Sequence, residues 1–316
     1  MQAQTDMTRP STNRQLRDFA LLILGATAIG NSSVLVRLAE ADPAATSFWR
    51  VAFAIPVFVV WSWIEKKAKP TGFSSRPLNP ALLGPALLAG LCFALDLTLS
   101  NVALGLTTMT SFIILVHLAP VFVVIVAWFW FGEKPTVRIV LALLLAIFGA
   151  ALLVQSGRAS TIASNALLGD IASVAAAMGY AGFILATRRA RMFGATGIVS
   201  LISAIACAVF SLVFVFALGE NLWPKNAYSW CMLALMGIGC HAFGQGLSAF
   251  AVGSLGSSVT SIVLVYAVAV TVSGGWLFFG EVPNLLQFSG AVLVLAAVTL
   301  CRPKEQPVGL TPGATQ

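Results

Sequence analysis

The chain contains 316 residues, of which 59% are hydrophobic and only 9% are charged. A soluble globular domain carries about 25% charged residues, so this composition excludes a soluble protein. A mean hydropathy of +0.93 over the whole length requires many apolar segments and not a single anchor. We therefore expect an all-α polytopic membrane protein.

A helix needs about 20 residues to cross a hydrocarbon core of about 30 Å. Cutting the chain at charges and turn residues leaves ten apolar runs near this length, joined by short loops. No loop is long enough to hold a separate soluble domain. In chain order, the predicted spans cover residues 16–37, 44–64, 80–101, 107–131, 136–155, 167–187, 196–218, 227–250, 255–279 and 284–301.

The distribution of basic residues predicts the orientation of these spans. The formal net charge is +7, with 18 Lys and Arg residues. Fourteen of them lie on the side of the N-terminus and three on the other side, while Arg50 lies within the second span. Because positive loops are retained in the cytoplasm, both termini are expected there. The excess of positive charge is thus explained by topology, and no nucleic-acid partner is expected.

The chain contains an internal repeat with an offset of 148 residues. Phe131-Gly132-Glu133 aligns with Phe279-Gly280-Glu281, and Pro135 aligns with Pro283. Five spans per half is an odd number, so the second half enters the membrane from the opposite side. We therefore predict a 5+5 inverted repeat around a central cavity, the arrangement of alternating-access transporters. The predicted parts are an N-terminal tail (1–15), two repeats (16–155 and 156–302) and a C-terminal tail (303–316).

These features resemble the drug/metabolite transporter superfamily. The residues that carry the resemblance are Trp49-Arg50 in span two, the run from Leu95 to Asn101, Leu118-Ala119-Pro120 in span four and the two Phe-Gly-Glu-x-Pro motifs. The sequence is most similar to EamA-type exporters, with aromatic amino acid exporters as one branch. The resemblance implies a bacterial inner-membrane exporter of small metabolites such as amino acids. One departure is Val268, which stands where the repeat would place a second proline.

Asp96 is the strongest candidate for a cavity residue, because ionisable groups inside spans are costly and face protein or water. It lies about 7 Å from the outer end of predicted span three, with Ser100 one turn further on the same face. It could bind a substrate amine or a proton. The alternative is a hydrogen bond that only packs two helices.

Two histidines lie near the middle of predicted spans, His117 in span four and His241 in span eight. Gln245 follows His241 by one turn and points the same way. Each could line a cavity, or could simply bond a neighbouring helix. Nothing near them in sequence provides the other ligands of a metal site, so no metal and no cofactor are expected.

Three further residues are uncharged site candidates. Asn31 lies in a small, polar patch of span one, where another helix can approach closely. Tyr180 in span six and Tyr266 in span nine could present a hydroxyl and a ring to a substrate, or could be packing residues.

Several other polar residues are assigned structural roles. Arg50 could bind a substrate carboxylate, but extension to the interface or pairing with another helix is preferred. Glu133 and Glu281 precede prolines that suit the first turn of the next helix, where a carboxylate complements the helix dipole. Trp128, Trp130, Trp223 and Trp230 are typical of interfacial aromatic belts.

The sequence thus favours a secondary transporter that carries a small, zwitterionic substrate, works as a monomer among lipids and is not an enzyme. It lacks a P-loop, and no nucleophile–base pair can be assembled. With a single candidate cavity cation, phosphate-bearing substrates are disfavoured. Proton-coupled efflux of cationic drugs is the alternative; more remote ones are an ion channel, a lipid scramblase and an intramembrane enzyme.

Overall fold

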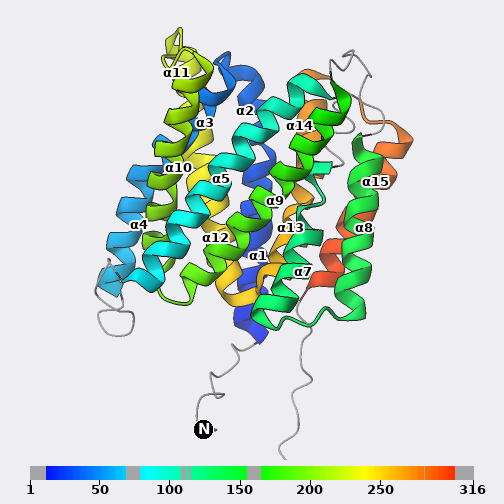
Figure 1. The fold of residues 1–316 in the computed structure, drawn as a ribbon. Helices are drawn as coiled ribbons and strands as arrows, with labels where there is room; N and C mark the ends of the chain where they lie inside the picture. The colour runs from blue at the N-terminus through cyan, green and yellow to red at the C-terminus, as the bar shows by residue number, and fades with distance from the viewer. Residues whose placement is uncertain are drawn as a thin grey trace, which may run out of the picture.

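The structure is a computed structural model that describes residues 12–68, 79–107, 112, 115–154, 165–280 and 282–302. Helices account for nearly all of this part of the chain (Figure 1). Their bounds are α1 (Thr12–Gly30), α2 (Ser32–Ala39), α3 (Pro43–Ala52), α4 (Ala54–Ala68), α5 (Pro80–Leu106), α7 (Ala119–Phe131), α8 (Val137–Val154), α9 (Ala166–Arg191), α10 (Thr196–Leu218), α11 (Ala227–Leu235), the π-helix η1 (Met236–Gln245), α12 (Gly246–Leu255), α13 (Ser257–Leu264), α14 (Tyr266–Phe279) and α15 (Leu285–Cys301).

The helices occupy the positions of the ten predicted spans. Within the described residues, seven helical segments are long and apolar enough to cross a membrane, and three shorter apolar helices match the remaining spans. Span one is α1 with α2, span two is α3 with α4, span eight is α11 with η1 and α12, and span nine is α13 with α14. The prediction of an all-α polytopic membrane protein is confirmed.

Local sequence signals define many helix ends. Asparagine side chains accept backbone hydrogen bonds at the starts of α5, α9, α11 and α15, which satisfies amide groups that have no partner within the helix. Gly132 and Gly280, the equivalent glycines of the repeated Phe-Gly-Glu motif, end α7 and α14 with φ of 66° and 68°. Glycine adopts this left-handed conformation without strain, which explains its place in both motifs.

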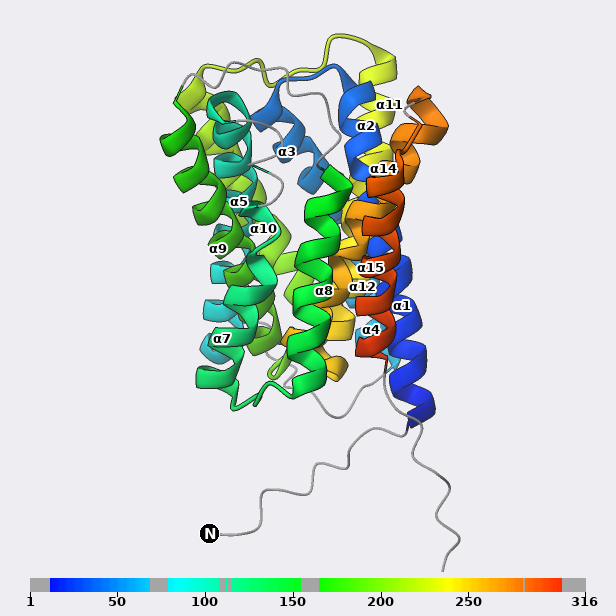
Figure 2. The same ribbon diagram turned by 90° about the vertical axis from the view of Figure 1, so that its right-hand side faces the viewer.

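The packing follows the inverted repeat. α5 of the first half packs along α9 of the second half, and the pair related to it by the repeat, η1 and α12 of the second half against α1 of the first, also packs. The fifth span of each half, α8 and α15, form a pair at one edge of the bundle (Figures 1 and 2). α1 begins and α15 ends at the same face, which we call the terminus face (Figure 2).

Candidate functional site

Five of the spans are interrupted within the bundle, as far as the described residues show. Interrupted helices at mid-membrane release backbone groups and commonly form the binding sites of transporters. The interruptions lie at Asn31 in span one, Phe53 in span two, His117 and Leu118 in span four, the π-helix in span eight and Val265 in span nine.

The interruptions in spans four and nine are related by the repeat. Leu118 N donates to Leu115 O at 3.1 Å, and Val265 N donates to Ile262 O at 3.1 Å. Both hydrogen bonds span three residues, so each helix has a 3₁₀-type turn at the interruption. Only the first copy has a proline nearby, at Pro120. The absence of a second proline therefore does not remove the equivalence of these two spans.

Both interruptions line a central cavity of about 220 Å³. Val116 and His117 of the first half contribute to its wall, as do their repeat equivalents Leu264 and Val265. The cavity therefore lies between the halves. Its polar lining residues are Ser32, Arg50, Asp96, Ser100, His117, Tyr180, Gln245 and Ser261.

Asp96 contributes a carboxyl group to the central cavity. Ser100 Oγ donates to Asp96 Oδ1 at 3.4 Å from one turn further along α5. Since α5 continues to Leu106, ten residues beyond Asp96, the carboxylate lies about 15 Å from that end of the helix. The candidate membrane span within α5 is Pro80–Ser100, which places Asp96 about 6 Å from the outer end of the span, close to the predicted depth of about 7 Å.

Arg50 contributes the positive charge, and the predicted extension of its side chain to the interface was wrong. Its side chain lines the central cavity instead of extending to the interface, and its Nε is buried with no hydrogen-bond partner within the described part of the chain. The two charges face one cavity, but no ion pair within 4.0 Å joins Arg50 to Asp96 among the described residues. The signal for this role in the sequence was a lone arginine six residues inside an apolar span.

Tyr180 reaches the cavity because α9 approaches α5 closely. A Cβ atom at the neighbouring Gly179 would lie 3.0 Å from Cys92 O and 3.1 Å from Asp96 N, so a glycine is required for this contact. Tyr180 also packs against Phe93, with ring centroids 6.3 Å apart. The close helix contact thus brings the Tyr180 hydroxyl to the cavity that holds Asp96.

The structure brings together five of the eight residues predicted from sequence, namely Asp96, Ser100, His117, Tyr180 and Gln245. Asn31 does not line the cavity; its Nδ2 donates to Thr27 O at 2.9 Å within span one, and Ser32 lines the cavity in its place. Tyr266 packs against the hydrophobic core. His241 lines a second, smaller cavity.

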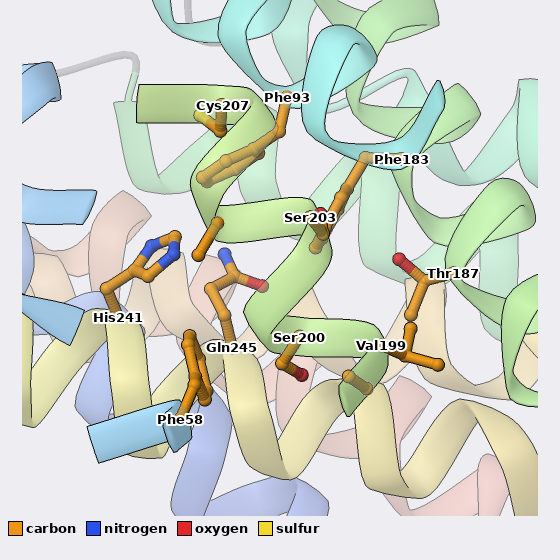
Figure 3. A pocket seen from close by; sticks show the side chains of 12 residues that line it. Phe58, Phe93, Phe183, Thr187, Val199, Ser200, Ser203, Cys207, His241 and Gln245 are labelled. Atoms are coloured by element: carbon orange, nitrogen blue, oxygen red, sulfur yellow. The ribbon is translucent and has the colours of Figure 1, made fainter. Parts of the chain in front are cut away.

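This second cavity, which we call the inner chamber, has a volume of about 20 Å³. Figure 3 shows His241 and Gln245 projecting from η1 towards α10, where Ser200 and Ser203 lie. Phe93 and Gln245 line both the inner chamber and the central cavity. The two cavities are therefore neighbours that share a wall.

Glu133 joins the two halves at the terminus face. Its carboxylate pairs with Arg188 Nη1 at 2.5 Å and accepts from Ser257 Oγ at 3.3 Å and Ser258 Oγ at 3.0 Å at the start of α13. We predicted that Glu133 complements the next helix, but it serves the start of a helix from the other half. Glu281 lies outside the described residues.

A membrane-spanning bundle with interrupted helices and a polar cavity between two halves is typical of secondary transporters. The comparisons with known proteins agree with this class. The chain belongs to the EamA-like transporter family, whose model matches residues 18–155 and again residues 167–302. The protein is therefore a multi-pass membrane protein and a transporter by family.

The individual proteins that match the chain share little sequence identity with it. The chain is 26% identical to the pseudopaline exporter CntI of Pseudomonas aeruginosa strains UCBPP-PA14 and PAO1, over 69% of this chain and 75% of the relative. Among solved structures, the chain is similar to a protein crystal structure with a TM-score of 0.73 at 16% identity, covering 91% of this chain and 96% of the other. That likeness concerns the fold alone.

Proposed function

We propose that the protein exports small zwitterionic metabolites, with amino acids as the best representatives, by alternating access across the inner membrane. The observation that carries this proposal is the presence of Arg50 and Asp96 in one cavity between the two halves. The proposal treats the chain as a carrier with no catalytic role.

A zwitterion matches these two charges. The guanidinium of Arg50 can donate two parallel hydrogen bonds to a carboxylate, and the carboxylate of Asp96 can accept from an ammonium group. Both charges interact more strongly with a bound substrate inside the bundle than they would in water, because the protein interior screens charges weakly. Tyr180, Gln245 and Ser100 add uncharged polar groups around them.

The size of the cavity also favours a small substrate. Its volume of about 220 Å³ lies below the ~300–1,000 Å³ of pockets for drug-sized ligands. The positive charge of Arg50 further disfavours a cationic drug, which was the alternative drawn from the sequence. A zwitterion is consistent with both the size and the charges.

Two observations support the direction of transport and the orientation of the chain. The relative named as a pseudopaline exporter supports export, and the 14-to-3 distribution of basic residues supports cytoplasmic termini. The single chain contains both repeats, which supports function as a monomer.

Counterflow in proteoliposomes tests the proposal with three matched compounds: phenylalanine, phenethylamine, which lacks the carboxylate, and 3-phenylpropionate, which lacks the amine. We expect the zwitterion to exchange and both analogues to fail. The panel should also include smaller neutral amino acids and pseudopaline. Faster exchange of phenethylamine than of phenylalanine would refute the zwitterion proposal and favour cation efflux, whereas exchange of none of the compounds would refute the amino-acid assignment.

A further inference from the structure

The inner chamber lies between the central cavity and the terminus face. Thr187 lies four residues before the end of α9, and Ser200 lies four residues after the start of α10; both of these ends are at the terminus face. Asp96 lies sixteen residues from the start of α5 at the same face. A solute that leaves the central cavity towards the terminus face therefore meets the inner chamber on its way.

Three buried polar atoms of the inner chamber have no hydrogen-bond partner among the described residues. His241 and Gln245 are each 4% exposed, and His241 Nδ1, Gln245 Oε1 and Thr187 Oγ1 have no partner within the described residues. Buried polar groups without partners are costly and call for an explanation, such as water or a ligand. The volume of about 20 Å³ admits about one water molecule. A dry packing core would not place three such atoms around a single small space.

The floor of the inner chamber is held closed by specific contacts at the terminus face. Arg191 donates from Nε to Ala249 O at 3.1 Å and from Nη1 to Gly194 O at 2.6 Å. Ala249 itself lines the inner chamber. Nearby, Glu65 accepts from Gly197 N at 2.7 Å, which ties α4 to α10. Each contact joins the side chain of Arg191 or Glu65 to a backbone group of another segment, so it can break without the loss of a hydrogen bond within a helix.

We propose that the inner chamber is the part of the transport path that opens to the terminus face, with a polar wall that hydrates and guides the solute. Phe93 and Gln245 form the gate between it and the central cavity. In the conformation described here the inner chamber is contracted to the size of a water molecule; in the conformation open to the terminus face it widens when the contacts of Arg191 break. The inference rests on an alternating-access carrier but not on the amino-acid substrate.

Cysteine accessibility tests this inference without any substrate. The five native cysteines are free and can be replaced by alanine. In that background Ser203→Cys places a thiol in the wall of the inner chamber, and Ser211→Cys places one on the same helix outside it. The two positions are matched, since both serines are buried, at 7% and 2% exposure. A charged, membrane-impermeant methanethiosulfonate reagent is then added from each side of oriented vesicles.

We expect position 203 to react at least about tenfold faster than position 211, and only from the terminus face, because even a minor open state exposes it. Adding Arg191→Gln should increase this rate further. Equal, slow reaction at both positions in both backgrounds would overturn the inner chamber as part of the path.

The gate is tested separately. Replacing Gln245 by alanine should allow the same reagent to reach position 203 from the opposite face as well. If Gln245→Ala leaves the side dependence unchanged, the gate assignment fails. Because neither measurement uses a transported substrate, they remain informative even if the amino-acid proposal fails.

Discussion

Phe93 and His241 occupy equivalent positions in the two repeats, and their ring centroids lie 5.4 Å apart. Equivalent residues meet where the pseudo-two-fold axis passes, so this contact marks the axis of the inverted repeat. The symmetry is broken there, because one half presents an apolar ring and the other an imidazole. The polar ring is the one whose Nδ1 lacks a partner in the described structure.

Replacing His241 by phenylalanine separates packing from polarity at this position. The fold should be retained, since the equivalent position in the other half already holds a phenylalanine, while transport should fall about 3- to 10-fold through loss of a polar contact. His241→Gln should retain more transport than His241→Phe. Transport rates and thermal unfolding in detergent would be measured together; equal rates for both variants and the unmodified protein would show that His241 only fills space.

The two cavity charges should control substrate discrimination. Arg50→Gln should weaken binding of phenylalanine about 10- to 100-fold, because a charge-assisted hydrogen bond contributes about 1.5–3 kcal/mol. Binding of phenethylamine should change little or improve. Asp96→Asn should likewise weaken binding of phenylalanine, whereas binding of 3-phenylpropionate, which has no amine, should change little or improve. Competition of each analogue against labelled phenylalanine measures these affinities, and identical losses for all three compounds would contradict direct charge recognition.

Glu133 should stabilise the conformation that is closed at the terminus face. Glu133→Gln weakens the pairing with Arg188 and the hydrogen bonds to the start of α13, at a cost of about 1–2 kcal/mol. We expect a lower unfolding midpoint and greater reactivity of the inner-chamber cysteine at position 203. The neighbouring Lys134→Gln removes an exposed charge and serves as the control. Equal effects of the two variants would argue against a specific contact between the halves.

Gly90 and Gly84 provide a matched pair on α5. A Cβ atom at Gly90 would lie 2.4 Å from Ser203 O and 2.6 Å from Ala206 Cβ, whereas nothing lies within 4 Å at Gly84. Gly90→Ala should therefore destabilise the protein by about 1–3 kcal/mol by forcing α5 away from α10. Gly84→Ala should be neutral or stabilise it by up to about 1 kcal/mol through helix propensity. Unfolding midpoints in detergent give both values; destabilisation by Gly84→Ala alone would reverse this account of the packing.

Asn31 and Ser32 are adjacent, but replacing each by alanine should affect the affinity for substrate differently. Asn31→Ala should change the apparent affinity for substrate by no more than about twofold, because its amide bonds within its own helix and does not line the cavity. Ser32→Ala removes a cavity hydroxyl and should weaken binding about fivefold. Saturation curves for transport would show the difference. A larger effect at Asn31 would place its side chain at the site in another conformation.

The number of spans, their approximate limits and the duplicated halves followed from the sequence alone. Hydrophobicity over about 20 residues is a local property, and the repeated Phe-Gly-Glu motif is visible without coordinates. Asp96 could also be found in this way, because a carboxylate in an apolar span is exceptional.

The sequence alone could not give the direction in which the side chains of Arg50 and Asn31 point. It also could not identify the helix that Glu133 contacts. Both depend on how each helix is rotated about its axis and on which helix lies beside it. Those quantities are set by contacts between distant segments, such as Gly179 against Cys92 and Asp96. A side chain one position further along a helix points about 100° away, so Ser32 reaches the cavity and Asn31 does not. Hydropathy contains no information on this rotation, and the packing of the two halves supplies it.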